Sequence, residues 1–432
     1  LYTCSEEGIS SIKNKIREYN LNRVIVASCT PRTHEPLFRS ACEEAGLNKY
    51  LFEFVNIRDQ CSWVLMNLPE EATEKAKTLI RAGVAKARLL EPLEEIEVKV
   101  TPSSLVIGGG ITGMSVALNL ANQGFEVHLV EKEAELGGLL LGIHKLFPSN
   151  KDAKELIIPI IEKVKSHNRI KTHLRAKVKE AAGFIGNYDV IVEEDGQEHK
   201  LNIGTIIVAT GAEEFKPIGQ YGYGEMTGVL TQLELEEKMK RGTVNGKNIV
   251  MINCVGARVP ERSYCSRFCC LTAIKNATLI KESNPAARVW ILHRDLMAYG
   301  MEFEDYYRKA MESGVRFIRY SLERPPKVIG DGKAEGIRVY HQLMQKEIEL
   351  PSDTLVLTTP LVPRSDNGEI SKMLKVPLSQ EGFFLEAHLK LQPVEFATDG
   401  IFICGSARWP VEVAEAIFQA YASSSKAAIP MR

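Results

Sequence analysis

The sequence has no apolar run long enough to span a bilayer, and neither sign of charge is in excess. It contains 54 Lys and Arg residues against 55 Asp and Glu residues, for a net charge of −1 over 432 residues. This balance gives no sign of a basic surface for nucleic acid, and the missing apolar run argues against a membrane-spanning helix. We therefore expect a soluble, cytoplasmic protein that is large enough for two or three domains.

Two further patterns are missing. The spacing C-x-x-C does not occur, which argues against the dithiol chemistry of thioredoxin reductase. No methionine or signal-peptide pattern stands before Leu1, so we expect the chain to begin inside a longer one. The nine cysteines are then more readily metal ligands, redox groups or buried thiols than structural disulfides.

A glycine-rich loop between two expected strands organises the sequence. Gly108, Gly110 and Gly113 form G-x-G-x-x-G directly after an apolar strand at 105–107, and a helix is expected over 112–123. The first glycine allows a tight turn, the second lets a pyrophosphate approach the backbone, and the third lets the helix pack closely on the strand. The helix N-terminus then points its N–H groups at the phosphates.

An acidic residue and a glycine pair complete this unit. Glu131 ends the expected strand 126–130, where its carboxylate can accept both ribose hydroxyls and disfavours a 2′-phosphate. Gly137 and Gly138 begin six residues later. The run E-x-x-x-x-x-G-G resembles the FAD-binding start of the two-dinucleotide-domain flavoproteins, the superfamily of thioredoxin and glutathione reductases. A lone glycine motif could be a chance turn, but the complete unit predicts a dinucleotide site and favours FAD over NAD.

Two later stretches resemble other parts of the flavin domain in that superfamily. One is TIIVATG at 205–211, and the other is ATDGIFICG at 397–405, which precedes an expected helix. The superfamily motif T-D-G-I-F-x-x-G-D closes over the ribityl chain, whereas here Ser406 stands in the place of the last aspartate. The residues of these stretches that we expect at the cofactor are Thr210, Gly211, Asp399 and Gly405.

The order of these stretches predicts an α/β protein of the thioredoxin-reductase-like type, a flavoprotein with two dinucleotide-binding domains. A small Rossmann-like α/β domain is expected before them, because the strand and helix pattern also occurs near the N-terminus. The expected domains are the N-terminal domain at 1–94, a discontinuous FAD domain at 95–220 and 360–432, and a second Rossmann-like domain at 245–358.

Four closely spaced cysteines stand where a pyridine-nucleotide reductase would have its second glycine loop. That loop is missing after the expected strand 247–253, so direct reduction by NAD(P)H at this position is not expected. The cysteines form C-x10-C-x3-C-C and are Cys254, Cys265, Cys269 and Cys270. Thiolates suit Fe–S clusters, Cu(I) and zinc, but zinc sites usually use C-x2-C pairs. Arginines in the same stretch suit an anionic cluster, so we favour [4Fe-4S], with zinc or buried thiols as alternatives.

With this cysteine pattern, the sequence resembles the A subunit of heterodisulfide reductase, the flavin and iron–sulfur subunit of methanogen electron-transfer complexes. The matching stretches are 29–35, 56–63, the glycine loop, 228–236 and 254–275. The resemblance implies that the four cysteines hold a [4Fe-4S] cluster near FAD. It also implies that Lys275 lies near flavin N5, whereas its spacing alone is equally typical of a solvated helix lysine. Cys4, Cys29 and Cys61 are ordinary thiols or electron-transfer groups.

The resemblance further implies an oxidoreductase subunit of methanogenesis in which FAD accepts two electrons and passes them singly through the cluster, with flavin-based electron bifurcation in the family. The implied partners are other heterodisulfide-reductase-type subunits, an electron-donor subunit linked to hydrogenase or formate dehydrogenase, and a second copy of the chain. Ferredoxin modules that many members carry are missing, so we expect a short variant or a fragment. The alternatives are a stand-alone NAD(P)H-dependent flavin disulfide reductase and a non-catalytic FAD and zinc assembly subunit.

Overall fold

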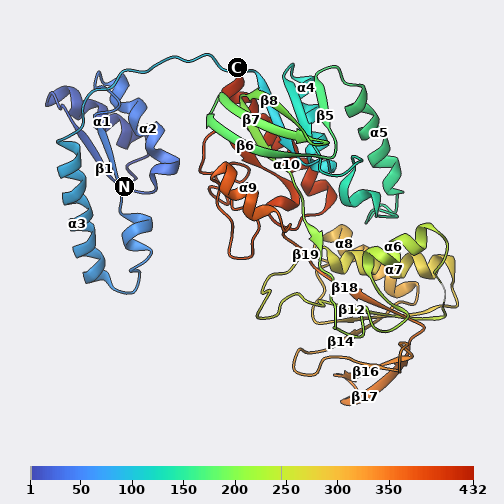
Figure 1. Cartoon of the computed structure of the whole chain (residues 1–432). Helices are drawn as coiled ribbons and strands as arrows, with labels where there is room; N and C mark the ends of the chain where they lie inside the picture. The colour runs from blue at the N-terminus through green and yellow to red at the C-terminus, as the bar shows by residue number, and fades with distance from the viewer. Residues whose placement is uncertain (1, 245) are drawn as a thin grey trace. The chain divides into compact units, whose positions relative to one another are not determined.

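The computed structural model describes residues 2–244 and 246–432, which form two compact units (Figure 1). The first unit comprises residues 1–98 and the second comprises residues 99–432. The division falls four residues after the expected end of the N-terminal domain at 94. Within the described residues, none of the helices combines the length and the apolar character needed to cross a membrane.

The first unit is a small α/β fold around a two-stranded parallel sheet. Phe38 and Phe52 stack in its core with their ring centroids 6.1 Å apart, and Cys42 is fully buried beside them. The expected strand and helix near the N-terminus are therefore present on a small scale. The elements of this unit are α1 (Glu6–Glu18), β1 (Val24–Ser28), α2 (Pro31–Glu44), β2 (Phe52–Asn56), the π-helical turn η1 (Arg58–Ser62) and α3 (Pro69–Ala87).

The second unit contains two domains of the same three-layer architecture. The first domain has a five-stranded parallel sheet in the order β20-β9-β3-β4-β5. Its strands are β3 (Ser103–Ile107), β4 (Glu126–Val130), β5 (Ile170–His173), β9 (Thr205–Val208) and β20 (Ile401–Ile403). The helices α4 (Ile111–Asn122), α5 (Ala153–Ser166) and α10 (Val413–Ala428) cover one face, and the antiparallel strands β6 (Ala176–Phe184), β7 (Asn187–Glu194) and β8 (Gln197–Ile203) cover the other.

The last three residues of strand β3 are apolar and pack on both faces of the sheet. Val106 packs among the residues of the helical layer, whereas Leu105 and Ile107 pack toward the antiparallel sheet. A parallel strand that is covered on both faces has no side for polar residues, so alternation disappears from its sequence. The uninterrupted apolar run before the glycine loop is the result.

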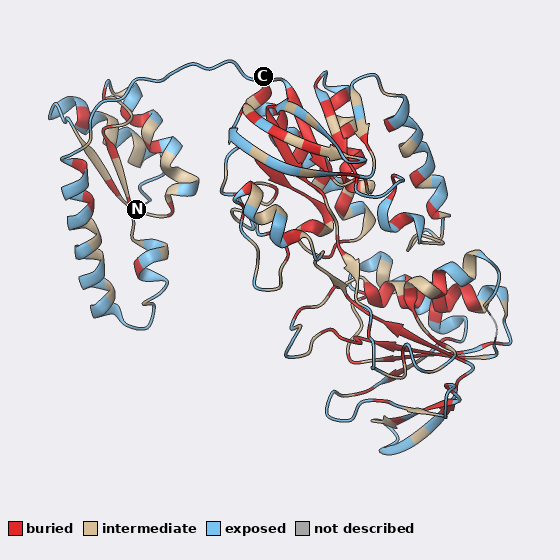
Figure 2. Cartoon of the chain, viewed as in Figure 1, coloured by how far each residue is buried: buried red, intermediate tan, exposed pale blue. Residues whose placement is uncertain are grey.

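The second domain repeats this plan with the sheet order β11-β18-β12-β13-β14. Its strands are β11 (Val229–Thr231), β12 (Asn248–Asn253), β13 (Arg288–His293), β14 (Arg316–Arg319) and β18 (Thr354–Thr358). Helices α6 (Gln232–Lys240), α7 (Cys269–Ser283) and α8 (Met301–Glu312) pack on one face, and β15 (Lys327–Ile329), β16 (Gly336–His341) and β17 (Lys346–Pro351) pack on the other. Figure 2 shows that much of α7 and of the central strands is buried.

The two domains are joined by short paired segments. Strand β10 (Glu213–Glu214) pairs antiparallel with β19 (Leu361–Val362) where the chain passes from one domain to the other and back. The first sheet is thus built from residues on both sides of the second domain, and β11 lies before the expected start of that domain at 245. The remaining elements are η2 (Gly138–Leu141), α9 (Asn367–Leu374), η3 (Gly405–Ala407) and η4 (Ile429–Met431).

A pair of histidines in the first domain, one of them fully buried, predicts a loss of stability in acid. His173 is fully buried and lies between His128 Nδ1, at 3.1 Å, and Glu194 Oε2, at 2.7 Å. Burial, with the nearby His173, lowers the pKa of His128 to about 4. Because the unfolded pKa is about 6.5, its neutral form contributes stability above that pH, and this contribution is lost as the pH falls toward about 4.

We therefore expect the midpoint temperature of unfolding to decrease as the pH is lowered from about 6.5 to about 4. In the His128→Gln variant this decrease should be smaller. The measurement is thermal unfolding across this pH range. His341→Gln, on the β16–β17 hairpin, is the control and should keep the wild-type slope. An unchanged slope in His128→Gln would show that His128 does not contribute.

Candidate functional site

A cavity of about 600 Å³ lies between the two domains of the second unit, at the carboxyl ends of strands from both sheets. Ile107 and Val130 reach it from the first sheet and Thr358 from the second. Open α/β sheets bind ligands at this edge. The sequence-predicted residues that line the cavity are Gly108, Gly110, Glu131, Gly137, Gly138, Thr210, Gly211, Cys269 and Lys275.

The glycine loop is shaped by its own backbone contacts. Gly108 has φ +114°, and a Cβ there would meet the carbonyl oxygen of Ala209. A Cβ on Gly113 would collide with the carbonyl oxygen of Gly108, which explains why Gly113 packs α4 against the loop without lining the cavity. Gly110 differs, because a Cβ there would have nothing within 4 Å. The open space is part of the cavity at the N-terminus of α4, where a phosphate group would bind.

Glu131 is fixed at the mouth of the loop. Glu131 is only 9% exposed, and its carboxylate accepts hydrogen bonds from the backbone N–H of Gly109 at 2.6 Å and of Glu133 at 2.9 Å. Each carboxylate oxygen keeps a second lone pair for a ligand hydroxyl. Thr210 Oγ1 and Thr359 Oγ1 are also at the cavity and are buried without a hydrogen-bond partner among the described residues. These unsatisfied hydroxyls and the space at Gly110 fit a polar ligand such as FAD.

The variant Gly110→Ala is expected to weaken ligand binding without affecting folding. Because the added methyl meets no protein atom and φ is −74°, we expect the variant to fold normally. The methyl occupies the space for the pyrophosphate, so we expect at least a tenfold loss of FAD affinity. FAD retained after gel filtration, together with the circular dichroism spectrum, measures both effects. Gly142→Ala, in a nearby turn, is the control and should bind FAD like the wild type. Wild-type affinity in Gly110→Ala would contradict this assignment.

Lys275 and Glu236 form a buried ion pair at the cavity. Lys275 lies on α7 and is 1% exposed, while Glu236 lies on α6 and is fully buried. Lys275 Nζ pairs with Glu236 Oε1 and donates to the carbonyl oxygen of Lys145 at 2.7 Å. The other oxygen of Glu236 accepts from the backbone N–H of His144 at 2.8 Å. The pair therefore connects α6 and α7 to the loop that follows the glycine pair in the first domain.

The sequence alone left open that Lys275 is a solvated helix lysine. The structure excludes this alternative, because Lys275 is buried in an ion pair. Burial lowers the pKa of Lys275, and the charge of Glu236 partly opposes that shift. Sequence reasoning assigned no role to Glu236, although this residue ends one of the stretches that carried the resemblance. Three glutamates stand at 234, 236 and 237, and only the orientation of α6 distinguishes the buried one from its exposed neighbour at 237.

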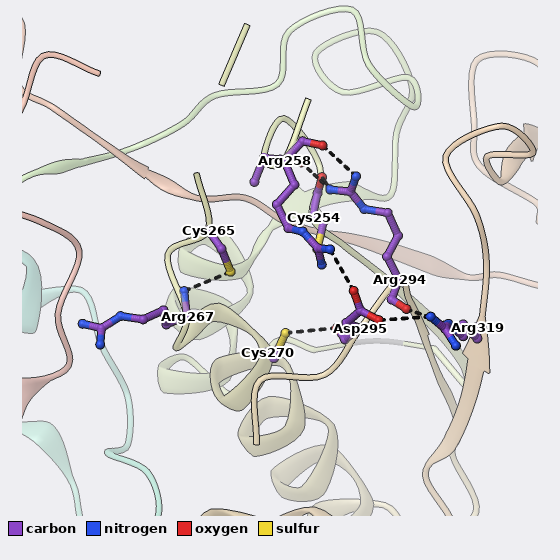
Figure 3. Close-up of polar contacts among 9 residues, drawn as sticks. Cys254, Arg258, Cys265, Arg267, Cys270, Arg294, Asp295 and Arg319 are labelled. Atoms are coloured by element: carbon purple, nitrogen blue, oxygen red, sulfur yellow. Dashed lines mark hydrogen bonds and ion pairs between the residues drawn. The ribbon is translucent and has the colours of Figure 1, made fainter. Parts of the chain in front are cut away.

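The four clustered cysteines meet at one end of the second sheet. Cys254 follows β12 with φ +64°, and Cys269 and Cys270 begin α7. Figure 3 shows the side chains of Cys254, Cys265 and Cys270 around a common region. Burial raises the pKa of Cys254, and the nearby Cys270 adds to this shift. A hydrogen bond between the adjacent thiols raises the pKa of Cys269 and lowers that of Cys270 to about 7.

Among residues 2–244 and 246–432, no three His, Cys, Asp or Glu side chains are placed to hold one metal ion. The donor set is nevertheless four thiols that influence one another electrostatically. Asn253 is fully buried beside them, and its side-chain amide helps to lower the pKa of Cys270. The chemistry of the set fits an iron–sulfur cluster, which carries several metal ions.

The cysteine loop is anchored to the first domain. Arg267 Nη2 donates to the carbonyl oxygen of Pro410 at 3.2 Å and to Glu415 Oε2, on α10, at 2.9 Å. Tyr264 donates from its hydroxyl to the carbonyl oxygen of Leu361 at 2.7 Å. These contacts hold the loop against the domain that carries the glycine motif.

Besides Gly113, the sequence-predicted cofactor residues Asp399 and Gly405 do not line the cavity. Asp399 precedes β20, and its carbonyl oxygen accepts from the Tyr188 hydroxyl at 2.5 Å. It therefore lies at the amino end of the strand, whereas the cavity is at the carboxyl end. Gly405 lies behind the lining, because a Cβ there would meet Thr112 Oγ1 at 2.6 Å. Ser406, in the place of the superfamily aspartate, does line the cavity.

The remaining cysteines of interest lie in the first unit. Cys29 Sγ accepts from Arg58 Nη1 at 2.9 Å, and Cys61 is buried and donates to the carbonyl oxygen of Ala72 at 2.8 Å. Cys4 is exposed. These contacts account for Cys29 and Cys61 as locally hydrogen-bonded thiols.

Comparisons with known proteins agree with this architecture. Residues 102–423 match the pyridine nucleotide-disulphide oxidoreductase family. Among solved structures, thioredoxin reductase from T. acidophilum has a TM-score of 0.53 at 17% identity, covering 76% of this chain and 98% of its own. The enzyme from Lactococcus lactis has a TM-score of 0.54 at 17% identity, with the same coverage. The predicted α/β fold with two dinucleotide-binding domains is confirmed.

Relatives with similar sequences identify the family of the chain more specifically. The iron-sulfur A subunit of the CoB–CoM heterodisulfide reductase of Methanocaldococcus jannaschii is 36% identical, covering 100% of this chain and 80% of the relative. The A subunit of the H(2):CoB-CoM heterodisulfide,ferredoxin reductase of Methanothermobacter thermautotrophicus is 35% identical, covering 100% and 79%. The first alignment spans 525 residues, more than the 432 of this chain, so the relative carries extra residues within the aligned region. With the flavoprotein fold and the cavity between its domains, these matches show that the chain is an oxidoreductase that belongs to the A-subunit family of heterodisulfide reductases.

Proposed function

We propose that the chain is the FAD-binding electron-transfer subunit of a heterodisulfide-reductase-like complex, with a [4Fe-4S] cluster at Cys254, Cys265, Cys269 and Cys270. One observation carries the proposal. Cys269 lines the same cavity as the glycine loop and Lys275, so a flavin and a cysteine-bound cluster would be neighbours. FAD supplies the chemistry, because it exchanges electrons in pairs or singly.

The residues of this chain would bind and orient the flavin. Gly110 leaves room for the pyrophosphate, Glu131 accepts the ribose hydroxyls, and the unsatisfied hydroxyl of Thr210 is available as a donor. Lys275 would place its positive charge beside the ring system, where a cation stabilises negative charge. Its charge is balanced by Glu236. Any gain of negative charge on the ligand would therefore compete with Glu236 for Lys275.

The second part of the proposal is iron–sulfur rather than zinc at the cysteines. The pattern C-x10-C-x3-C-C lacks the paired knuckles usual for zinc. A cluster spreads its thiolate ligands over several metal ions, which suits this arrangement better. The alternative of a FAD and zinc assembly subunit is therefore less well supported.

The names of the relatives suggest which partner subunits the chain binds. The names of the two relatives above describe subunits of reductases that act on the CoB–CoM heterodisulfide, and one name includes ferredoxin. We extend this to the present chain as an association with other heterodisulfide-reductase-type subunits, with a hydrogenase-linked or formate-dehydrogenase-linked donor, and with a second copy of the chain. Electron bifurcation at the flavin is the most specific form of the proposal.

The deciding experiment is anaerobic purification followed by measurement of FAD, iron and acid-labile sulfide per chain. We expect flavin bands together with broad iron–sulfur absorption at about 400 nm. Zinc in place of iron and sulfide would support the assembly role and end the cluster proposal. Rapid bleaching of the flavin by NAD(P)H alone would support a stand-alone reductase, which the missing second glycine loop argues against.

A further inference from the structure

Charged side chains surround the cysteine loop, among them Arg258, Arg294 and Asp295. Arg294 is 9% exposed and donates to backbone carbonyl oxygens of the loop, among them those of Ala257 and, at 2.9 Å, Arg258. These hydrogen bonds shape the loop, and Arg294 also lowers the pKa of Cys254 through its charge and a side-chain hydrogen bond. Arg258 instead extends its guanidinium beside Cys254 toward Asp295, as Figure 3 shows.

Arg258 is electrostatically coupled to the sulfurs. Its Nη2 pairs with Asp295 Oδ2 at 2.8 Å, and this hydrogen bond is the largest cause that raises the pKa of Arg258. The thiols of Cys254 and Cys265 raise it further. The influence is mutual, since Arg258 is among the groups that lower the pKa of Cys270. The guanidinium is therefore close enough to several sulfurs to respond to their charge.

Asp295 opposes this positive charge. Its hydrogen bond with Arg258 is the main reason that its pKa is lowered, so it is ionised at neutral pH. Arg319 Nη2 contacts its other oxygen at 3.2 Å, and its backbone carbonyl oxygen accepts from Cys270 Sγ at 3.8 Å. Asp295 thus holds two arginines and lies directly against one of the cysteines.

We infer that the Arg258–Asp295 pair sets the reduction potential of the group bound by the four cysteines, with Arg258 raising it and Asp295 lowering it. The inference rests on the proposed iron–sulfur cluster. One-electron reduction adds one negative charge to an anionic cluster. A nearby cation stabilises the reduced form more than the oxidised form, and a nearby anion does the opposite.

The test is an EPR-monitored redox titration of the whole purified protein in Arg258→Gln, Arg258→Lys and Asp295→Asn. Arg258→Gln should lower the cluster midpoint and Asp295→Asn should raise it. At a fixed potential near the midpoint, each should change the ratio of reduced to oxidised cluster about tenfold, which is about 59 mV for a one-electron couple. Arg258→Lys keeps the charge and should restore most of the wild-type value.

The control is Arg338→Gln, which removes an arginine from an exposed pair with Glu349 on the β16–β17 hairpin and should leave the midpoint unchanged. The inference would be overturned if the midpoint potential shifted in the same direction in Arg258→Gln and Asp295→Asn. It would also be overturned if the midpoint potential stayed unchanged in either one of them. If one variant does not fold, the sign of the shift in the other and the rescue by lysine still decide. A wild-type protein without iron and sulfide would instead refute the cluster itself, a separate outcome that is visible before any variant is made.

Discussion

Replacing Cys269 with serine is expected to remove most of the iron from the protein while FAD stays bound. Cys269 is 7% exposed at the start of α7 and lies against Cys270. A serine hydroxyl is a hard, weakly acidic ligand and does not replace a thiolate at an iron–sulfur cluster. We expect iron per FAD to fall from about four to below about one, with a matching loss of absorption at about 400 nm.

The control for this variant is Cys404→Ala. Cys404 is a fully buried thiol of the same unit, and burial raises its pKa to about 12, which is typical of an inert core cysteine. This variant should keep its iron. Full iron content in Cys269→Ser would remove Cys269 from the proposed ligands, and equal iron loss in both variants would indicate general damage rather than loss of a ligand.

Breaking the Lys275–Glu236 pair from one side is expected to destabilise the second unit strongly. Lys275→Met leaves a fully buried carboxylate, and Glu236→Leu leaves a buried ammonium group. Removing one partner of such a pair typically costs about 3–5 kcal/mol. The double variant Lys275→Met with Glu236→Leu removes both charges, so we expect it to recover most of this loss.

Hydrogen exchange at the amides of α7, in FAD-free protein, measures the opening free energy where the pair lies. The exposed pair Arg338–Glu349 provides the control, because Arg338→Met should leave the opening free energy of α7 almost unchanged. Additive losses in the double variant would contradict the coupling. In that case the two side chains would stabilise α6 and α7 independently.

The parts of the molecule that the sequence predicts well are those whose reasons are local. The strand, glycine loop, helix and second strand around Gly108 and Glu131 follow from backbone and capping requirements within about 30 residues. Strand β4 begins and ends as expected at 126–130, and the carboxylate of Glu131 lies in the glycine loop. The expected strand 247–253 also places Cys254 directly after β12, whereas helix α7, which begins at Cys269, was not expected from the sequence.

The parts that were missed depend on contacts between distant segments. Glu236 meets Lys275 across 39 residues, and neither side chain carries a local signal of burial. Strand β11 is only three residues long and joins the second sheet by pairing with β18, more than 100 residues later. Asp399 was assigned by analogy with a motif whose final aspartate is missing, and it lies at the other end of its strand from the cavity.

The anchoring of the cysteine loop through Arg267 has a kinetic consequence. When an electron carrier sits on a mobile segment, the transfer rate is limited by the motion of that segment. Such a rate decreases as the viscosity of the solvent increases. Here Arg267 ties the loop to Pro410 and Glu415 of the domain that carries the glycine motif. The distance an electron must cross would then be constant from one cycle to the next, and added glycerol or sucrose should leave the internal transfer rate unchanged.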